Sequence, residues 1–269
     1  RHPPPLGRTT VAFAIPYGND VSLRIAQLDD DPDAPFPPVG RALAEPDGLL
    51  AFGGDLSSQR LLNAYRHGIF PWFSEDEPPL WWSPSRRAVF RTDHVRLSSR
   101  RRRALRKSTL VVRADTCFRT VIEACAHLPR PGQSGGTWIT AAMIEAYVEL
   151  HRLGHVHSIE VFDGDELVGG LYGLAVGRMF CGESMFSAQS GASSIALAAL
   201  ARRLHAWDWP LIDAQVPNDH TRRLGVETWP RSAYLQALDG LRDGPEPAGG
   251  WTPRFGDMPA ASLADPSAA

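Results

Sequence analysis

The 269-residue chain has few lysines and cysteines and no long apolar run. It has one lysine, Lys107, and three cysteines, with no CxxC pair. An odd number of widely spaced cysteines argues against a disulfide framework or a zinc ribbon and fits a reducing cytoplasm. The apolar stretch Ile195–Leu200 is far too short to span a membrane, and residues 1–10 lack the apolar core of a signal peptide. We therefore expect a cytoplasmic protein without membrane contact.

Net charge is also nearly absent, but the charges are strongly segregated. The 28 Arg and Lys residues almost balance 30 Asp and Glu residues, and the resulting −2 excludes a globally basic nucleic-acid coat. Residues 86–107, however, hold ten of the cations against one acid, Asp93, so this basic segment carries +9 and the rest of the chain −11. We expect an acidic globular protein with one basic surface.

Proline, glycine and acidic clusters divide the chain into four parts. We predict a poorly ordered leader (1–35), a small N-terminal domain (36–95), a larger domain (96–243) and a Pro/Gly/Ala-rich tail (244–269). In the small domain, Ser57 is a suitable N-cap for a helix that ends at Gly68.

The larger domain alternates helical and strand patterns. Strands at 155–162, 166–176 and 178–186 are separated by turns so short that they require antiparallel hairpins. Further strands are predicted at 110–113 and 211–215, and helices at 116–126, 140–154, 193–206 and 232–241. The fold class that we expect is α+β, with a mixed, largely antiparallel sheet in an acyltransferase-like layout.

The basic segment has two interpretations. From Arg96 to Lys107, seven of twelve residues are cationic, so a helix there carries charge on most of its faces. A solvated helix usually mixes both signs and gains ion pairs one turn apart. Because acids are missing, self-repulsion favours an external anion, and few aromatics are present to read bases. We expect contacts with a nucleic-acid backbone.

Two predicted strands carry polar residues within apolar sequence. Glu183 is either exposed on an edge strand or turned into a cavity, where it can bind an ammonium group. Period-two alternation puts Asp213 and Gln215 on one face, where they either orient an amine or cap the following turn. Gln is a very poor base, so Gln215 can only accept or relay a hydrogen bond. The sequence leaves these alternatives open.

Other familiar sites are not indicated. His155 and His157 share a strand face but lack a third ligand at a suitable spacing, so we expect no metal. Ser184 lacks the glycines of a nucleophile elbow, and no glycine-rich phosphate loop is present. The turn that would hold a coenzyme A pyrophosphate is missing before the helix at Ser193. We expect no cofactor.

Longer motifs resemble those of the bacterial leucyl/phenylalanyl-tRNA–protein transferases. They follow the family's order over about residues 36–241 and leave out the leader and the tail: Pro46–Leu56, Tyr65–Phe73, Trp81–Pro84, Gly136–Thr140, His157–Val161, Gly169–Gly173, Gly182–Ser187 and Leu211–Gln215. The resemblance implies a small N-terminal domain followed by a GNAT-like acyltransferase domain.

The resemblance also implies an activity. It is the transfer of Leu, Phe or Met from aminoacyl-tRNA to the α-amino group of a protein that begins with Arg or Lys, which marks that protein for proteolysis as an N-degron. An aminoacyl ester is already activated, so the enzyme mainly has to position ester and amine. We expect a monomeric aminoacyltransferase that needs no cofactor.

The same resemblance assigns roles to particular residues. Asp213 and Gln215 match the pair at the reacting amine, with Asp213 polarising Gln215, and Glu183 matches a carboxylate that helps to hold the amine. Trp72 and Trp138 match tryptophans near the 3′-terminal adenosine. The tRNA acceptor arm is expected to contact Arg100, Arg102, Arg103, Arg106 and Lys107. The aminoacyl side chain is expected in an apolar pocket formed by Leu171, Phe180, Met185, Leu197, Leu200 and Ile212.

Two other classes of function are compatible with parts of the sequence. One is a GNAT-like acyltransferase that uses acyl-CoA or builds peptidoglycan bridges, and the missing pyrophosphate turn argues against its CoA version. The other is a non-enzymatic RNA-binding module. Such a module would keep its tRNA affinity after mutation of Glu183, Asp213 and Gln215.

Overall fold

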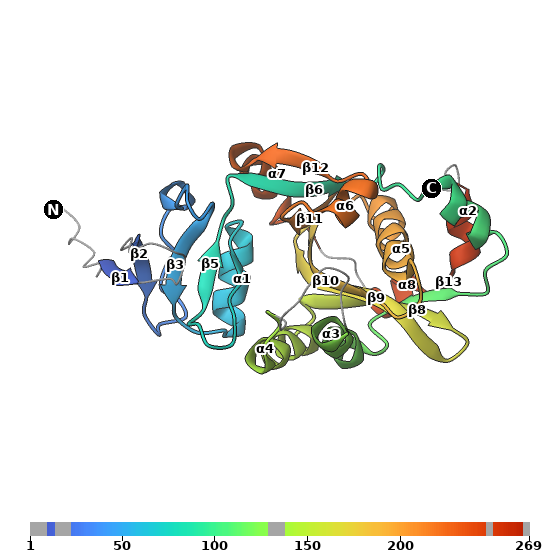
Figure 1. Cartoon of the computed structure of the whole chain (residues 1–269), viewed down its shortest axis with the longest axis horizontal. Coiled ribbons are helices and arrows are strands. Elements are labelled where there is room, and N and C mark those ends of the chain that lie inside the picture. Colours follow the sequence, from blue (N-terminus) through green and yellow to red (C-terminus); the bar gives the residue numbers. More distant parts are fainter. Residues whose placement is uncertain (1–9, 14–22, 129–137, 246–249, 266–269) are drawn as a thin grey trace. The chain divides into compact units, whose positions relative to one another are not determined.

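The computed structural model describes residues 10–13, 23–128, 138–245 and 250–265. The chain forms two compact units that divide between Ser85 and Arg86 (Figure 1). The boundary expected after residue 95 falls later than this division. The reason is strand β6 (Arg86–Arg91), which lies in the basic segment and pairs with two strands of the second unit.

The first unit contains a five-stranded sheet in the order β1-β2-β3-β5-β4. Helix α1 (Ser58–Arg66) begins as predicted after Ser57, whose hydroxyl accepts a hydrogen bond from the Arg60 N–H at 3.3 Å. The strands are β1 (Thr10–Phe13), β2 (Leu23–Leu28), β3 (Leu49–Gly53), β4 (Phe70–Pro71) and β5 (Leu80–Trp82), and a short 3-10 turn covers Val39–Arg41.

Part of the predicted leader belongs to this unit. Strand β2 pairs in parallel with β3, so its main-chain groups are hydrogen-bonded within the sheet. The buried Arg60 side chain donates to the main-chain carbonyls of Asp29 and Asp31 at 2.8 and 2.6 Å. Both contacts join residues far apart in the chain, and the acidic run around them shows no periodicity that would have predicted them. Residues 1–9 and 14–22 lie outside the described residues.

The second unit is built on an eight-stranded mixed sheet in the order β12-β6-β11-β10-β9-β8-β7-β13. Only β10 and β11 pair in parallel, and the other neighbouring strands are antiparallel. Besides β6, the strands are β7 (Val111–Ala114), β8 (Val156–Asp163), β9 (Glu166–Val176), β10 (Met179–Ser187), β11 (Leu211–Gln215), β12 (Glu227–Pro230) and β13 (Met258–Pro259). The predicted α+β class and the hairpins from β8 to β10 are confirmed.

Helices cover both faces of this sheet. Helix α5 (Ala192–Ala206) packs its apolar residues onto one face, while α3 (Phe118–His127) and α4 (Ala141–Arg152) lie on the other side of β8–β10 (Figure 1). Helix α7 (Arg231–Leu241) packs against β6 and β12. Two shorter helices, α2 (Ser99–Leu105) and α6 (Asp219–Arg223), complete the part before the C-terminal segment. No helix of the described chain is long and apolar enough to cross a membrane.

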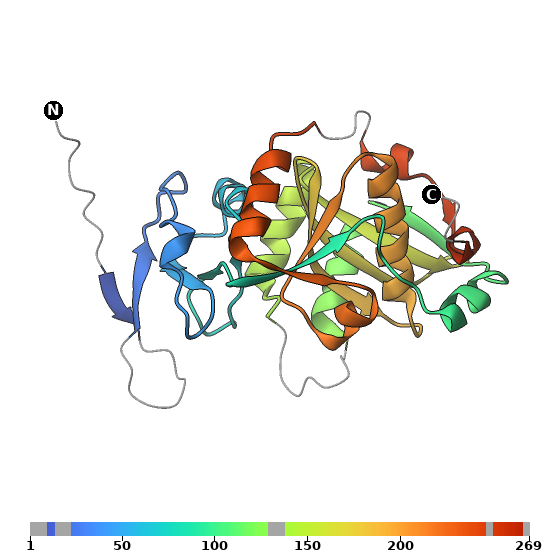
Figure 2. The same cartoon turned by 90° about the horizontal axis from the view of Figure 1, so that it is seen from above.

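Most of the predicted tail is also folded. Helix α8 (Trp251–Phe255), strand β13 and the 3-10 turn Ala260–Ala264 pack beside β7, α2 and α5 (Figure 2). Trp251 and Phe255 are buried in the same apolar cluster as α5. These few apolar side chains are spaced among Pro, Gly and Ala, and the composition therefore predicted a tail. The structure instead shows a segment that pairs with β7 and packs into the apolar cluster.

Candidate active site

The candidate site lies where two parallel strands stop pairing. The pairing of β10 with β11 extends only to Cys181 opposite Asp213, although both strands continue. Beyond that point β10 has a register shift around Glu183, and β11 has one between Asp213 and Gln215. Such β-bulges bend a strand and redirect its side chains. The two bulges bring Glu183 and Gln215 together.

Glu183 is buried, and the side chains of Gln215 and Tyr147 are among its hydrogen-bond donors. The Gln215 amide donates from Nε2 to Glu183 Oε1 at 2.6 Å, and the Tyr147 hydroxyl donates to Oε2 at 3.2 Å. Strand β10 lies inside the sheet, so the alternative of an exposed Glu183 on an edge strand is excluded. With its amide nitrogen turned to Glu183, half-buried Gln215 has its amide oxygen left to accept another hydrogen bond.

Asp213 is completely buried and contacts Gln215 differently from the sequence-based expectation. Its Oδ1 accepts the main-chain N–H of Gln215 at 2.8 Å, whereas the Gln215 side chain contacts Glu183. Arg87 donates to both carboxylate oxygens, from Nε at 2.8 Å and from Nη2 at 2.7 Å. The Tyr234 hydroxyl donates to Oδ2 at 2.8 Å. We expected the side chains of Asp213 and Gln215 on one face because side chains alternate along a strand. The bulge at the end of β11 interrupts this alternation.

Burial sets the protonation of the groups around Asp213. Burial raises the pKa of the Tyr234 hydroxyl well above its usual value, against the opposing charge of Arg87, so this hydroxyl keeps its proton for Asp213. Burial by itself lowers the pKa of Arg87, but the charge of Asp213 outweighs it and the pKa is raised. Burial also raises the pKa of the Cys181 thiol well above its usual value. Arg87 is therefore charged and Tyr234 is neutral.

The residues predicted to line an apolar pocket lie on the α5 side of the sheet. Phe180 pairs with Ile212, one position before the pair of Cys181 and Asp213, so the two pairs face opposite sides of the sheet. Five of the six predicted residues are buried in the apolar cluster beneath α5, and Met185, which packs against that cluster, is only partly buried. The predicted polar and apolar groups therefore lie on opposite sides of the sheet: Leu171, Phe180, Met185, Leu197, Leu200 and Ile212 on the α5 side, and Glu183, Asp213 and Gln215 on the other.

The two predicted adenosine-binding tryptophans belong to different units. Trp72, in the first unit, is 47% exposed, and its ring lies 5.7 Å from that of Trp82. Trp138, in the second unit, is half-buried and lies two residues before Thr140, the N-cap of α4. An exposed indole such as that of Trp72 can stack on a base.

The basic segment exposes fewer free charges than its composition suggests. Arg87 is buried against Asp213, and Arg91 forms an ion pair with Asp93 at 3.3 Å. Arg101 donates to the Ser190 carbonyl at 2.8 Å. Half-buried Arg102 has no hydrogen-bond partner at Nε among the described residues. The remaining predicted tRNA contacts are exposed at and after α2: Arg100, Arg103, Arg106 and Lys107.

Sequence reasoning missed three residues of the site. Arg87 counts there only as one cation of the basic segment, and Tyr147 has no assigned role. Tyr234 was not singled out. The position of Asp213 in an apolar strand was one indication, because a buried carboxylate almost always has a partner. The sequence does not show that this partner is Arg87.

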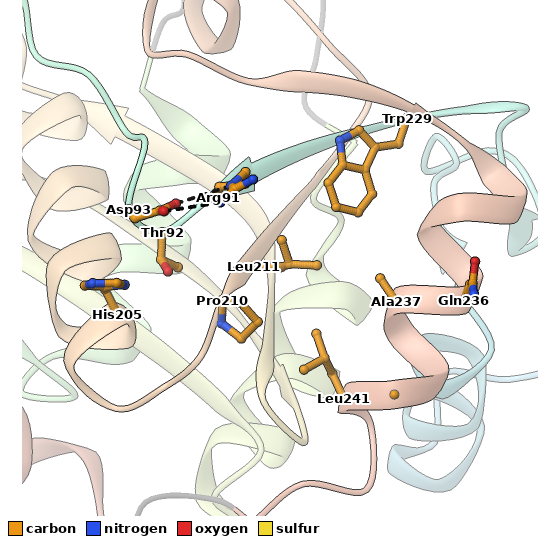
Figure 3. A pocket seen from close by; sticks show the side chains of 11 residues that line it. Arg91, Thr92, Asp93, His205, Pro210, Leu211, Trp229, Gln236, Ala237 and Leu241 are labelled. Carbon is orange, nitrogen blue, oxygen red and sulfur yellow. Dashed lines mark hydrogen bonds and ion pairs between the residues drawn. The ribbon is translucent and has the colours of Figure 1, made fainter.

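One cavity lies away from these residues. It has a volume of about 470 Å³ and is lined by Leu211 at the beginning of β11, Trp229 of β12 and residues of α7. Figure 3 shows its polar rim, formed by the Arg91–Asp93 ion pair. None of the predicted site residues lines it, because Gln215 is at the other end of β11.

The described residues contain no group of three His, Cys, Asp or Glu side chains that could hold a metal ion. His157, one of the two histidines considered from the sequence, has its Nδ1 2.8 Å from Asp115 Oδ2. Its ring stacks on Trp251 at 4.0 Å, so this histidine is a packed internal group.

Comparisons with known proteins give a consistent family. The model of the leucyl/phenylalanyl-tRNA protein transferase matches residues 89–239, and the model of its N-terminal domain matches residues 54–85. A relative of that name from Xanthomonas axonopodis pv. citri is 62% identical over 238 residues, which cover 88% of this chain and 95% of the relative. One from Xylella fastidiosa is 59% identical and covers 86% and 94%. The crystal structure of FemX superimposes on 68% of this chain and 71% of its own, at 10% identity and a TM-score of 0.41. The two family matches and the long relatives lead to one conclusion: the chain belongs to the leucyl/phenylalanyl-tRNA protein transferase family.

Proposed function

We propose that this aminoacyltransferase moves Leu, Phe or Met from aminoacyl-tRNA to the α-amino group of proteins that begin with Arg or Lys. The product is an N-degron, and the enzyme acts as a cytoplasmic monomer without a cofactor. The observation that carries the proposal is the Gln215–Glu183 hydrogen bond, 2.6 Å long, where β10 and β11 stop pairing.

The reaction needs no change of oxidation state. The amine nitrogen attacks the ester carbonyl, a C–N bond forms, and the C–O bond to the tRNA 3′ oxygen breaks. The proton lost by the amine ends on the released 3′-hydroxyl. Because a free α-amino group has a pKa of about 7.7–8.0, part of it is already neutral and nucleophilic at neutral pH. Positioning is then the main task of the protein.

Glu183 and Gln215 have complementary roles in this proposal. Since the Gln215 amide nitrogen donates to Glu183, its amide oxygen accepts an N–H of the incoming amine and directs the nitrogen lone pair at the ester. The Glu183 carboxylate attracts a cationic acceptor N-terminus to this position. Tyr147 holds the second carboxylate oxygen and keeps Glu183 in place. Asp213 belongs to the same proposed site through the Gln215 main chain.

The aminoacyl-tRNA is proposed to bind with its side chain in the apolar pocket on the α5 side. Met185, the partly buried member, forms the rim of that pocket and adapts to Leu, Phe or Met. For the terminal adenosine, Trp72 of the first unit and Trp138 of the second unit are separate stacking candidates. The acceptor arm contacts the exposed cations of α2 and the residues after it, with Arg102 beside them: Arg100, Arg102, Arg103, Arg106 and Lys107.

The test is a transfer assay with purified protein, tRNA charged with labelled Leu, and short peptides. We expect label on peptides that begin with Arg or Lys, and none on the same Arg peptide after N-acetylation. Glu183→Gln should lose most of the transfer while it still binds tRNA. If intact Leu-tRNA gives no label on either peptide, the proposed acceptor specificity is wrong. A reporter protein with N-terminal Arg should also be degraded faster in bacterial cells that express the chain.

A further inference from the structure

The main chain at Gln215 adopts a conformation that side-chain-bearing residues rarely take. Its φ is +59°, in the left-handed region that favours glycine. Such a conformation persists only where surrounding contacts fix it. Here the fixing contact is the 2.8 Å hydrogen bond from the Gln215 N–H to Asp213 Oδ1, an Asx turn across two residues.

Asp213 is in turn fixed from two other elements. Arg87 of β6 binds both carboxylate oxygens, and Tyr234 of α7 binds Oδ2. All three side chains are buried, and the Arg87 guanidinium lies 4.6 Å from the centre of the Tyr234 ring. Each oxygen of Asp213 thus accepts two hydrogen bonds within the described residues. A carboxylate held in this way has little capacity left for a substrate amine.

We propose that Arg87 and Tyr234 are positioning residues of the transfer reaction, which act through Asp213 on the turn that aims Gln215 at Glu183. Neither residue touches substrate. The inference rests on the proposed function, and it assigns to Asp213 a role in shaping the main chain. A rigid turn keeps the amide oxygen of Gln215 directed at the amine, and a loosened turn lets the amide rotate away.

The first test separates positioning from stability. Tyr234→Phe removes one hydroxyl and should lower kcat about five- to tenfold, with the KM for Leu-tRNA within about twofold of wild type. The pH profile of kcat should keep its shape. Arg87→Lys keeps the charge and should retain more activity than Arg87→Met. Leu238→Ala is the matched control, because Leu238 is buried on the same helix and lies outside the Asp213 network. It should lower Tm at least as much and leave kcat unchanged.

The second test does not depend on activity. The backbone amide proton of Gln215 reports its hydrogen bond to Asp213 in a ¹H–¹⁵N NMR spectrum. Tyr234→Phe and Arg87→Lys should move this resonance upfield because the carboxylate is less firmly held. Leu238→Ala should leave it in place.

Each outcome bears on the proposal. It is overturned if Tyr234→Phe and Arg87→Lys lower Tm but leave kcat and the Gln215 resonance unchanged, since the network is then only structural. A shifted pH profile in Tyr234→Phe also overturns it, because Asp213 then takes part in proton transfer. A wild-type protein that fails with both Arg and Lys peptides overturns the proposed function instead, while the NMR arm still decides whether Arg87 and Tyr234 hold the turn.

Discussion

Arg87 and Asp213 form a bidentate ion pair at 2.8 and 2.7 Å, and both side chains are almost completely buried. The pair joins two neighbouring strands across 126 residues of sequence. It takes one cation of the basic segment into the interior. At the same time it fixes the carboxylate next to the residues proposed for transfer.

Breaking this pair from one side should cost more than replacing both partners. Asp213→Leu or Arg87→Met leaves a buried charged group without its ion-pair partner, and we expect each to lower the free energy of unfolding by about 3–5 kcal/mol. The double variant should be clearly more stable than the sum of the two losses implies. Urea unfolding of the four proteins measures this. Additive losses would show that the two charges do not depend on each other.

The Glu183 carboxylate should matter for transfer far more than an exposed one. Glu183→Gln replaces the charged acceptor of the Gln215 amide, and we expect kcat/KM to fall by about 10- to 100-fold. Glu166→Gln is the matched control, because Glu166 is exposed at the beginning of β9. The transfer assay with an Arg peptide gives the comparison. If Glu183→Gln and Glu166→Gln are equally active, the Glu183 carboxylate has no role in transfer.

The salt dependence of tRNA binding should distinguish free cations from paired ones. Arg103→Ala and Lys107→Ala each remove an exposed cation, and we expect the slope of log K against log salt to become shallower by about 0.7–0.9. Arg91→Ala should leave the slope unchanged because Arg91 is paired with Asp93. Filter binding at several salt concentrations checks this. If Arg91→Ala reduces the slope as much as Arg103→Ala does, Arg91 also contacts tRNA and its ion pair with Asp93 does not prevent the contact.

Glu160 should make the stability depend on pH between about 4.5 and 7. Burial raises the pKa of this carboxyl from 4.5 to about 7, and the charge of Asp115 acts in the same direction. The folded protein then binds a proton more tightly than the unfolded chain, so the contribution of Glu160 is full below pH 4.5 and is lost as the pH rises through 7.

We expect Glu160→Gln to flatten this part of the pH profile. Urea unfolding between pH 4 and 8 provides the measurement, and Glu166→Gln serves as the exposed control. An unchanged slope in Glu160→Gln would show that the carboxyl is ionised over the whole range.

The C-terminal segment should contribute strongly to stability. Phe255 is completely buried in the cluster beneath α5, and Phe255→Ala should lower the free energy of unfolding by about 3–5 kcal/mol. Thr252→Ala, on the exposed side of the same short helix, should change it by less than about 0.5 kcal/mol. Thermal unfolding of both variants tests whether the segment is docked. Similar melting temperatures would indicate that it is not.

Local patterns in the sequence were sufficient for much of the fold. The predicted strands 166–176 and 211–215 have the bounds of β9 and β11, and Ser57 caps its helix as expected. Alternation, turn residues and N-caps act over a few positions, so the sequence displays them directly. The ordered motifs also identified the family without any structure.

What the sequence could not determine depends on contacts between distant residues. Two bulges on adjacent strands bring Glu183 and Gln215 together, and the partner of Asp213 is Arg87, which the sequence showed only as one cation of the basic segment. Strand β2 and helix α8 are ordered because β3 and the α5 cluster hold them, although their own compositions indicated a leader and a tail. The sequence thus determined most of the element types and three residues of the candidate site, Glu183, Asp213 and Gln215. The tertiary structure alone decided which of these residues meet, because burial and pairing are set by the whole sheet.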